Sequence, residues 1–304
     1  MTHTTYLITG GAGFIGTNLA ERLVREGKRV IVVDNLAGGT DPKRLPETVV
    51  FHNLDICETD ALTKVMEGVD AVVHLAALPR VQFSIEHPFE ATHANVIGTL
   101  SVLEAARRAG VKRIVYAASS SAYGDQEVMP LVETLPPQPK SPYGLHKYWG
   151  EQMMKLWYEL HGLETVSLRF FNVYGPHLDP NGAYALVIGK FLKQRQEGNP
   201  MTITGDGEQS RDFTHVYDIV DGIFRASESE SVGQGEVFNL GAGRNISINR
   251  VAEIIGGPVE HVAPRVEPKH TCADTTRIRN VLGWQPTILL EDGIGELKVL
   301  FGIQ

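Results

Sequence analysis

The hydrophobic and polar residues of this 304-residue chain follow two alternating patterns. Short apolar runs rich in β-branched residues are typical of buried strands, and longer segments with apolar residues every three or four positions are typical of amphipathic helices. The expected strands are 5–9, 29–34, 49–54, 70–76, 113–119 and 165–171, and the clearest helices are 15–26, 91–109 and 144–161. This alternation predicts βαβ units, and therefore an α/β fold with a doubly wound parallel sheet.

The regular alternation weakens after about residue 172, which indicates a change of organisation. Two later loops, "GPHLDPNGAY" and "TGDGEQSRDF", are rich in turn residues and charges. A further apolar run at 236–241 reads as a strand that returns to the main sheet. We therefore expect a first domain over residues 1–172 and a smaller, mainly substrate-binding region over 173–304 that is interleaved with it.

Composition excludes several classes of function. The net charge of -8 argues against affinity for nucleic acid or anionic membranes. Cys57 and Cys272 form no motif and the histidines lack ligand spacing, so neither a disulfide framework nor a metal site is predicted. The N-terminus runs directly into a strand, and no apolar run approaches the ~20 residues of a membrane helix. A cytoplasmic protein is expected.

A glycine-rich turn follows the first strand. The peptide "YLITGGAGFIG" places Gly10, Gly13 and Gly16 at the start of the first helix, where backbone N–H groups can approach a pyrophosphate. Asp34 ends the second strand about 20 residues later, where a carboxylate binds ribose hydroxyls and repels a 2′-phosphate. The pattern predicts a Rossmann-type site for NAD rather than NADP. The alternative is a structural turn followed by an unrelated aspartate.

The peptide "SPYGLHK" contains a second candidate motif. Ser141 suits an N-cap and Pro142 suits the first helical position, so a helix is expected to begin here. Tyr143 and Lys147, four residues apart, then share one face of that helix. Taken alone, this spacing favours two neighbours on a surface helix, because about 0.3 such pairs arise by chance in this composition.

Many peptides in order along the chain resemble those of the extended short-chain dehydrogenase/reductase family, and of its NAD-dependent nucleotide-sugar 4-epimerases in particular. They include "TGGAGFIG", "VVDN", "HLAA", "SSSAYG", "YGLHK", "RFFNVYGP", "GDGEQSRDF" and "LGWQP", and they cover nearly the whole chain. The resemblance implies a homodimer formed through two helices per subunit, here 91–109 and 144–161. Besides the glycines and Asp34, it implies NAD contacts from Phe14, Ile15, Asn35, Asp55, Ile56, Leu75, Ala76, Ala77, Asn95, Tyr143, Lys147 and Phe171.

The resemblance changes the interpretation of Tyr143, which becomes the expected catalytic base. Only about one phenol in a thousand is ionised at pH 7, so a nearby Lys147 ammonium and a cationic nicotinamide are expected to stabilise the phenolate. Ser119 is similar to the family's hydroxyl residue that relays the proton; the alternative is an ordinary serine at a strand end. The related dehydratases carry an Asp-Glu pair where this chain has Ser120 and Ser121, so dehydration is not expected.

The resemblance also implies a nucleoside diphosphate sugar as the substrate. Asn172 and Arg211 match positions that hold the diphosphate, although Arg211 could instead pair with Asp212 or Asp218. Arg265 is a further candidate, but "PRVEP" departs from the family pattern around it.

Small side chains and one further position concern the sugar. Ser84, Ser120 and Ser121 would leave room for it to turn. Thr271 matches the position that gates the substituent on C2, and its small size predicts space for an acetamido group. The peptides 179–185 and 205–213 are most similar to those of the N-acetylhexosamine branch.

Together these features predict NAD-dependent 4-epimerisation of a UDP-hexose through a transient 4-keto sugar. The expected substrates are UDP-glucose and UDP-galactose, and also UDP-N-acetylglucosamine and UDP-N-acetylgalactosamine. One alternative is a UDP-glucuronate decarboxylase or another nucleotide-sugar-modifying enzyme of the same family. An alternative from another class is a catalytically silent NAD-binding scaffold, which would be expected to lose part of the set Ser119, Tyr143 and Lys147.

Overall fold

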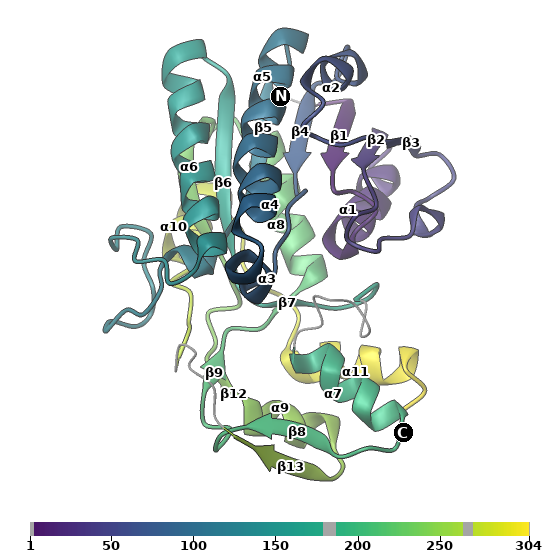
Figure 1. Cartoon of the computed structure of the whole chain (residues 1–304), viewed down its shortest axis with the longest axis vertical. Helices are drawn as coiled ribbons and strands as arrows, with labels where there is room; N and C mark the ends of the chain where they lie inside the picture. Colours follow the sequence, from purple (N-terminus) through teal and green to yellow (C-terminus); the bar gives the residue numbers. More distant parts are fainter. Residues whose placement is uncertain (1–2, 179–186, 264–269, 304) are drawn as a thin grey trace.

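A seven-stranded parallel sheet forms the centre of the molecule, in the order β11-β6-β5-β4-β1-β2-β3 (Figure 1). The computed structural model describes residues 3–178, 187–263 and 270–303. The strands are β1 (Thr5–Thr9), β2 (Arg29–Asp34), β3 (Val50–Asn53), β4 (Ala71–His74), β5 (Arg113–Ser119), β6 (Glu164–Phe170) and β11 (Gln234–Leu240). The chain runs outward from β1 to β3 and then from β4 to β6, so the predicted doubly wound α/β fold is confirmed.

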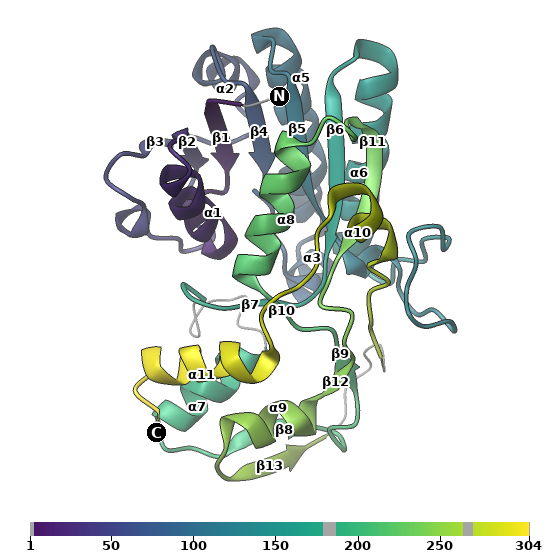
Figure 2. The same ribbon diagram turned by 180° about the vertical axis from the view of Figure 1, so that it is seen from behind.

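Helices cover both faces of the sheet, because alternate strand residues point to opposite faces. Tyr6 and Ile8 join a core shared with α1 and α8, whereas Leu7 joins a core shared with α2, α5 and α6. Figure 2 shows α1 and α8 in front of the sheet. The helices packed around the sheet are α1 (Phe14–Arg25), α2 (Thr59–Val65), α3 (Val81–Glu86), α4 (Pro88–Thr92), α5 (Gly98–Ala109), α6 (Pro142–His161), α8 (Val216–Glu228) and α10 (Thr276–Leu282), with 3-10 turns at Pro42–Arg44 and Ser120–Ala122.

The helix expected at 91–109 is interrupted. A π-helical turn, His93–Ile97, separates α4 from α5. The Asn95 side chain within it accepts from Leu78 N at 2.7 Å and donates to Leu78 O at 3.1 Å. A π-helical turn contains an extra residue and is frequent at functional sites. Here it brings Asn95 to the loop that follows β4.

The smaller region lies beyond the carboxyl ends of the strands, whose arrows point toward it in Figure 1. Its own core includes Phe191, Ile203, Val251 and Ile294. No helix in the described ranges is long and apolar enough to cross a membrane. The elements of this region are β7 (Val173–Tyr174), α7 (Val187–Gln196), β8 (Met201–Thr204), β9 (Ser210–Arg211), β10 (Thr214–His215), β12 (Ile246–Ser247), α9 (Ile248–Ile255), β13 (Val259–Val262) and α11 (Leu290–Leu300).

The two regions share parts of the chain. β11 pairs with β6 at the edge of the main sheet, with Phe238 opposite Leu168. Ile219 and Ile223 of α8, together with Trp284, belong to the core beneath β1. The segments 216–240 and 276–284 therefore pack with the first region, although they follow residue 172 in sequence.

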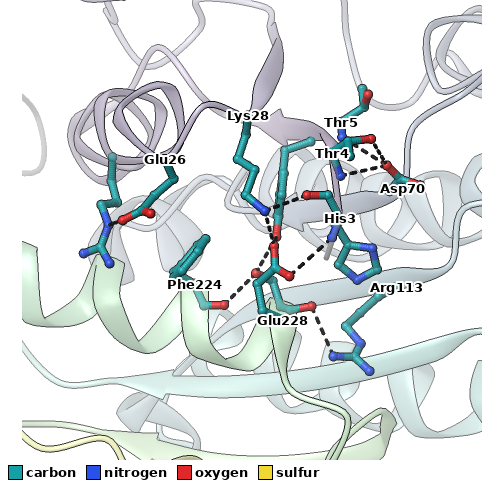
Figure 3. Close-up of polar contacts among 12 residues, drawn as sticks. His3, Thr4, Thr5, Glu26, Lys28, Asp70, Arg113, Phe224 and Glu228 are labelled. Atoms are coloured by element: carbon teal, nitrogen blue, oxygen red, sulfur yellow. Dashed lines mark hydrogen bonds and ion pairs between the residues drawn. The ribbon is translucent and has the colours of Figure 1, made fainter. Parts of the chain in front are cut away.

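A polar cluster at the amino ends of the strands attaches α8 to the sheet (Figure 3). Lys28 Nζ donates to Glu228 Oε1 at 2.6 Å and to His3 O at 2.7 Å. The Tyr6 hydroxyl donates to the same Glu228 oxygen at 2.7 Å. Arg113 donates to the carbonyl oxygens of Ala226 and Ser227 at 3.2 and 3.1 Å, which satisfies groups left open at the end of α8.

Candidate active site

The glycine-rich turn lies at the carboxyl edge of the sheet, between β1 and α1. Gly10 has a φ of 68°, and a Cβ on it would lie 2.8 Å from the Ala76 Cα. A Cβ on Gly16 would lie 2.6 Å from Gly10 O. Gly13 is the N-cap of α1 and has no side chain with which to cap the helix. The positive end of α1 can therefore face an anionic ligand across backbone alone, which fits a pyrophosphate.

Asp34 ends β2 beside this turn. Its Oδ2 accepts from Ala12 N at 3.1 Å, and its Oδ1 accepts from Leu36 N at 2.8 Å and Thr40 Oγ1 at 3.2 Å. Leu36 has a φ of 60°, a conformation that costs a bulky residue free energy and here shapes the loop around the carboxylate. This carboxylate is held in place beside the turn, as the ribose-binding prediction requires.

A second carboxylate follows β3. Asp55 accepts from Asn35 Nδ2 at 2.9 Å and from Cys57 N at 2.8 Å. Burial raises the pKa of Asp55, but the hydrogen bonds from Cys57 and Asn35 outweigh it, so the pKa lies below its usual value. The predicted pair Asn35 and Asp55 thus forms one ionised, hydrogen-bonded unit next to Asp34.

The remaining residues predicted to contact NAD lie around the same edge, with different exposure. Leu75, Ala76 and Ala77 follow β4 and are half-buried, as are Phe14 and Ile15 in the first turn of α1. Two others are buried. Ile56 is 8% exposed, and Phe171 is 0% exposed in a cluster with Tyr123, Leu131 and Ala273.

His74, which the sequence pattern did not single out, is buried beneath the carboxyl edge of the sheet, between Thr9 and Thr99. It is fully buried, with its Nδ1 2.7 Å from Thr9 Oγ1 and its Nε2 3.0 Å from Thr99 Oγ1. Burial lowers the pKa of His74 to about 3, so the ring is neutral at ordinary pH. It joins the residue before Gly10 to α5. The only signal in the sequence was a histidine at the end of an apolar strand.

The first turn of α6 positions Tyr143 through two serine hydroxyls. Ser141 is the N-cap and accepts from Gly144 N at 3.1 Å, with Pro142 at the first helical position. Ser84 Oγ accepts from Tyr143 N at 3.1 Å and donates to Val81 O at 2.6 Å. Ser84 is 0% exposed. It accepts from the first turn of the helix that carries Tyr143, and its expected place beside the sugar stays a prediction.

Ser119 and Tyr143 are brought together at the end of β5. Hydrogen bonding from Ser119 lowers the pKa of the Tyr143 phenol, whereas burial acts more strongly and raises it. Ser119 Oγ accepts from Ser121 Oγ at 2.8 Å and from Ser121 N at 3.2 Å. Because Ser121 supplies donors to Ser119, the Ser119 proton is left for the Tyr143 oxygen. Ser120 begins the 3-10 turn between them.

Lys147 lies one turn after Tyr143 on α6, as the spacing predicted. Its Nζ donates to Ala117 O at 2.7 Å and stands 4.9 Å from the centre of the Tyr116 ring. Within the described chain, no hydrogen bond joins Lys147 to Tyr143. Burial lowers the pKa of Lys147 to about 7, while the charge of Glu151 acts in the opposite direction. Burial is thus the largest influence on the pKa of both groups, and the expectation that the Lys147 ammonium and a bound nicotinamide together stabilise the phenolate stays a prediction.

Glu151 and Arg169 form a buried ion pair behind Lys147. Arg169 donates to both Glu151 oxygens, at 2.8 and 2.7 Å, and its guanidinium lies 4.4 Å from the centre of the Tyr123 ring. Burial lowers the pKa of Arg169, but the bonds to Glu151 outweigh it and the pKa lies above its usual value. The i+4 spacing from Lys147 to Glu151 was visible in the sequence, whereas nothing there indicated its partner Arg169.

Asn172, Arg211 and Thr271, three of the predicted substrate residues, lie where the two regions join. Asn172 Nδ2 donates to Asp212 O at 3.2 Å, next to Arg211 in β9. The carboxylates of Asp212 and Asp218 accept hydrogen bonds from backbone N–H groups, so the pairing of Arg211 with either of them stays an open alternative. Thr271 N donates to Ser210 O at 3.2 Å, which places the predicted sugar gate beside β9. Arg265 and the peptide 179–185 lie outside the described residues.

The parallel sheet, the glycine-rich turn and the aspartate that ends β2 together define an enzyme class that binds a dinucleotide on a Rossmann-type fold. The chain belongs to the NAD dependent epimerase/dehydratase family, whose model matches residues 6–241. The family resemblance is thereby confirmed, and NAD is the cofactor.

Three similar proteins place the chain more closely. It is 37% identical over 309 residues to a UDP-glucuronate 4-epimerase of Thermodesulfobacterium geofontis, covering 95% of this chain and 93% of that one. The UDP-glucose 4-epimerase of Thermotoga maritima, solved with UDP-glucose, has a TM-score of 0.91 and 35% identity over 98% of both chains. A UDP-N-acetylglucosamine 4-epimerase of Methanobrevibacter ruminantium, solved with UDP-N-acetylmuramic acid, has a TM-score of 0.91 and 32% identity over 97% of both. The chain is thus a UDP-sugar epimerase family member, and these relatives differ in their sugar.

Proposed function

We propose that this chain catalyses the NAD-dependent 4-epimerisation of UDP-glucose and UDP-galactose, and also of UDP-N-acetylglucosamine and UDP-N-acetylgalactosamine. The observation that carries the proposal is the hydrogen-bonded pair Ser121 and Ser119 at the carboxyl edge of the sheet, beside the Tyr143 phenol whose pKa Ser119 lowers. This phenol lies beside the cofactor-binding turn, where a proton can be taken from a sugar hydroxyl.

NAD, when bound, supplies the group that accepts hydride from the sugar carbon and returns it. The residues present fit such a cofactor, because side chains are sterically excluded at Gly10 and Gly16 and a carboxylate is fixed at Asp34. The protein's own part is to hold that cofactor and to move a proton at the 4-oxygen. No net oxidation results, so the cofactor is not consumed.

Tyr143 Oη takes the proton of the 4-hydroxyl as a 4-keto sugar forms, and gives it back in the second half of the reaction. The hydrogen bond from Ser119 favours the ionised phenol, and burial opposes it. Lys147 lies on the same face of α6 as Tyr143, and its ammonium donates to Ala117 O. This ammonium adds positive potential near Tyr143 Oη. Ser120 and Ser121 carry no carboxylate, which argues against dehydration.

The nucleotide side of the site is assigned to Asn172 and Arg211, with Arg265 as a further candidate. Charge-assisted hydrogen bonds from a guanidinium suit a diphosphate. Anchoring the diphosphate leaves the sugar free to turn and present its other face after oxidation. The small side chains Ser120 and Ser121 leave room for that movement.

Thr271 is proposed to determine whether an acetamido group fits at C2. Replacing it by tyrosine should crowd that group, and overpacking costs about 1–3 kcal/mol, or about a 5–150-fold loss in kcat/KM. The measurement is steady-state turnover of Thr271→Tyr on UDP-N-acetylglucosamine and on UDP-glucose. A selective loss on the N-acetylated substrate supports the gate. Equal losses on both, or no turnover of UDP-N-acetylglucosamine by the unmodified protein, contradict it.

UDP-glucuronate is the second candidate substrate, and the likeness to the UDP-glucuronate 4-epimerase of T. geofontis favours it. The deciding experiment incubates the purified protein separately with UDP-glucose, UDP-N-acetylglucosamine and UDP-glucuronate and identifies the products. Turnover of UDP-glucuronate alone would replace the proposal, and release of carbon dioxide would indicate a decarboxylase. Binding of NAD without turnover of any of the three would favour a silent scaffold.

A homodimer formed through α5 and α6 is proposed on the basis of the apolar side chains that these helices expose. They are Leu100, Trp149, Leu156 and Leu160, which are 37%, 43%, 44% and 64% exposed. Exposed apolar patches of this kind mark protein interfaces. Light scattering of the purified protein and of Leu160→Glu tests the pairing, since the charge should shift the mass toward the monomer. The cytoplasmic location stays a prediction.

A further inference from the structure

Asp212 is a fully buried carboxylate held by uncharged donors. Its Oδ1 accepts from Ala242 N at 2.7 Å and from Thr214 Oγ1 at 3.4 Å. Its Oδ2 accepts from Gly243 N and from Ala273 N, both at 2.9 Å. Burying an ion is costly unless hydrogen bonds compensate it, so these donors are what keep Asp212 in place.

The donors come from segments that are far apart in sequence. Ala242 and Gly243 follow β11, whereas Ala273 lies in the segment that leads to α10. A Cβ on Gly241 would lie 2.6 Å from the Ala273 Cβ and 2.9 Å from Asp212 Oδ2. The backbone after β11 is therefore packed directly between the other two segments. The Asp212 carboxylate accepts hydrogen bonds from both the segment after β11 and the segment before α10, and so joins them to its own segment.

Two of these segments carry residues assigned to the substrate. Arg211 precedes Asp212, and Asn172 Nδ2 donates to the Asp212 carbonyl oxygen at 3.2 Å. Thr271 lies two residues before Ala273, and its N–H donates to Ser210 O at 3.2 Å. The diphosphate side and the sugar side of the proposed site are thus joined through one carboxylate.

We propose that Asp212 is a positioning residue, which fixes the spacing between Asn172 and Arg211 on the diphosphate side and Thr271 on the sugar side. The proposal rests on the proposed function. A carboxylate is needed because two donors converge on each oxygen. An amide would turn an NH2 group toward backbone N–H groups and lose at least one of these contacts.

The ionisation of Asp212 agrees with this arrangement. Burial raises the pKa of Asp212 to about 6, and the hydrogen bonds from Ala273, Ala242 and Gly243 oppose that rise. The protein therefore keeps a group that is unfavourable when buried in charged form. A role in the geometry of the site gives a reason for retaining it.

Asp218 provides a matched control. It is also buried, at 4% exposure, and it also accepts hydrogen bonds from uncharged groups. Thr287 N, Thr287 Oγ1 and Ile288 N donate to it at 3.0, 2.8 and 3.1 Å, which joins α8 to the segment before α11. Within residues 3–178, 187–263 and 270–303, none of these hydrogen-bond donors to Asp218 is a residue assigned to the substrate.

The experiment compares Asp212→Asn and Asp218→Asn with the unmodified protein. Turnover of UDP-glucose, the dissociation constant of UDP and the urea midpoint of unfolding are measured for each, together with the NAD content. Both variants should unfold at lower urea. Only Asp212→Asn should raise KM and the UDP dissociation constant, by about tenfold, with kcat changed less than about threefold and NAD retained. Equal effects of the two variants on KM and UDP binding would overturn the proposal.

Thr214→Val serves where Asp212→Asn does not fold, since it removes the Thr214 hydroxyl that bonds to Asp212 and keeps the side-chain shape. It should weaken UDP binding by about threefold, and unchanged binding would count against the proposal. The outcome also separates the two levels of inference. If the unmodified protein turns over a UDP-sugar and binds UDP, and the variants do so equally well, only the role of Asp212 is rejected. An unmodified protein that neither binds UDP nor turns over a UDP-sugar rejects the proposed function, and this inference with it.

Discussion

The two ends of the parallel sheet differ in how their charged side chains are surrounded. At the amino end, Figure 3 shows Lys28 with Glu228, and Asp70 with Thr4 and Thr5. Asp70 also pairs with Lys112. The hydrogen bond from Lys112 holds the pKa of Asp70 well below its usual value. Such pairing keeps carboxylates ionised in the folded protein.

At the carboxyl end, Asp55 and Arg169 are also kept charged by their partners, but burial dominates at three other groups. It lowers the pKa of Lys147 to about 7, raises that of Tyr143 and raises that of Asp212 to about 6. Each of these shifts disfavours the charged form, and the nearby hydrogen bonds compensate only in part. Perturbed pKa values of this kind gather where a protein binds ligands and performs chemistry. Charge pairs at the amino end thus stabilise the fold, whereas Lys147, Tyr143 and Asp212 are buried groups beside the proposed site.

The largest expected effect comes from Tyr143→Phe. Removing the phenol oxygen should lower kcat by about 10²–10⁴-fold, the usual contribution of a general acid–base group. The fold and NAD content should be retained, because no hydrogen bond that positions α6 uses that oxygen. Epimerase assays and the absorbance of bound NAD measure this, with Tyr148→Phe on the same helix as the control. Substantial activity in Tyr143→Phe would remove Tyr143 from the mechanism.

Arg113→Met tests the amino end. Arg113 is 2% exposed and bonds to Glu164 and to carbonyl oxygens at the end of α8. Leaving Glu164 and those carbonyls without this partner should lower the free energy of unfolding by about 3–5 kcal/mol. The kcat of the folded variant should stay unchanged. Urea unfolding measures the free energy of unfolding, with Arg108→Met at an exposed position as the control. A marked fall in kcat would contradict the assignment of Arg113 to stability rather than to function.

The carboxyl end should reveal itself in the pH dependence of stability. The folded protein releases the Lys147 proton near pH 7, but the unfolded chain holds it to about pH 10.4. The unfolded state therefore binds more protons between these values, and the unfolding free energy contributed by Lys147 rises with pH there. Relative to Lys147→Met, the unmodified protein should gain a few kcal/mol between pH 7 and 10. A constant difference across that range would show that burial does not control this lysine.

Asp70→Asn should give the smallest effect, and the contribution of Asp70 also rises with pH but in a more acidic range than that of Lys147. The folded pKa of Asp70 is depressed, so its contribution is present above the unfolded value near 4 and is lost as pH falls. Because its pair with Lys112 is partly exposed, we expect about 1 kcal/mol or less at pH 7. Unfolding curves from pH 7 to 2 measure it, and the exposed Asp60→Asn should change nothing. A difference that grows toward acid would contradict the sign.

The sequence was sufficient where a pattern is local. Apolar runs gave the strands within one or two residues, and Ser141 and Pro142 gave the start of α6. The interruption at His93–Ile97 was not predictable, because it depends on Asn95 reaching Leu78 in a distant loop. The same holds for Ser84, whose partner Tyr143 lies 59 residues away.

The candidate site shows the same limit. The residue types at Ser119, Tyr143 and Lys147 indicated proton transfer, and the chain belongs to the family that these residues suggested. Their electrostatics were predicted less well, because pairwise spacing along a helix says nothing of desolvation or of a competing acceptor such as Ala117 O. Asp212 was noted only as a rival partner for Arg211, since three of its donors come from residues that are distant in sequence.

The position of β11 has a consequence for synthesis of the chain. β6 is finished at Phe170, but the strand that pairs with it ends only at Leu240. Until the ribosome has delivered those later residues, the outer edge of β6 has open backbone groups, which are prone to join other strands. The main sheet of the nascent chain can therefore be completed only after β11 has been synthesised. A gene fragment cut after codon 172 should accordingly yield aggregated protein rather than an isolated NAD-binding module.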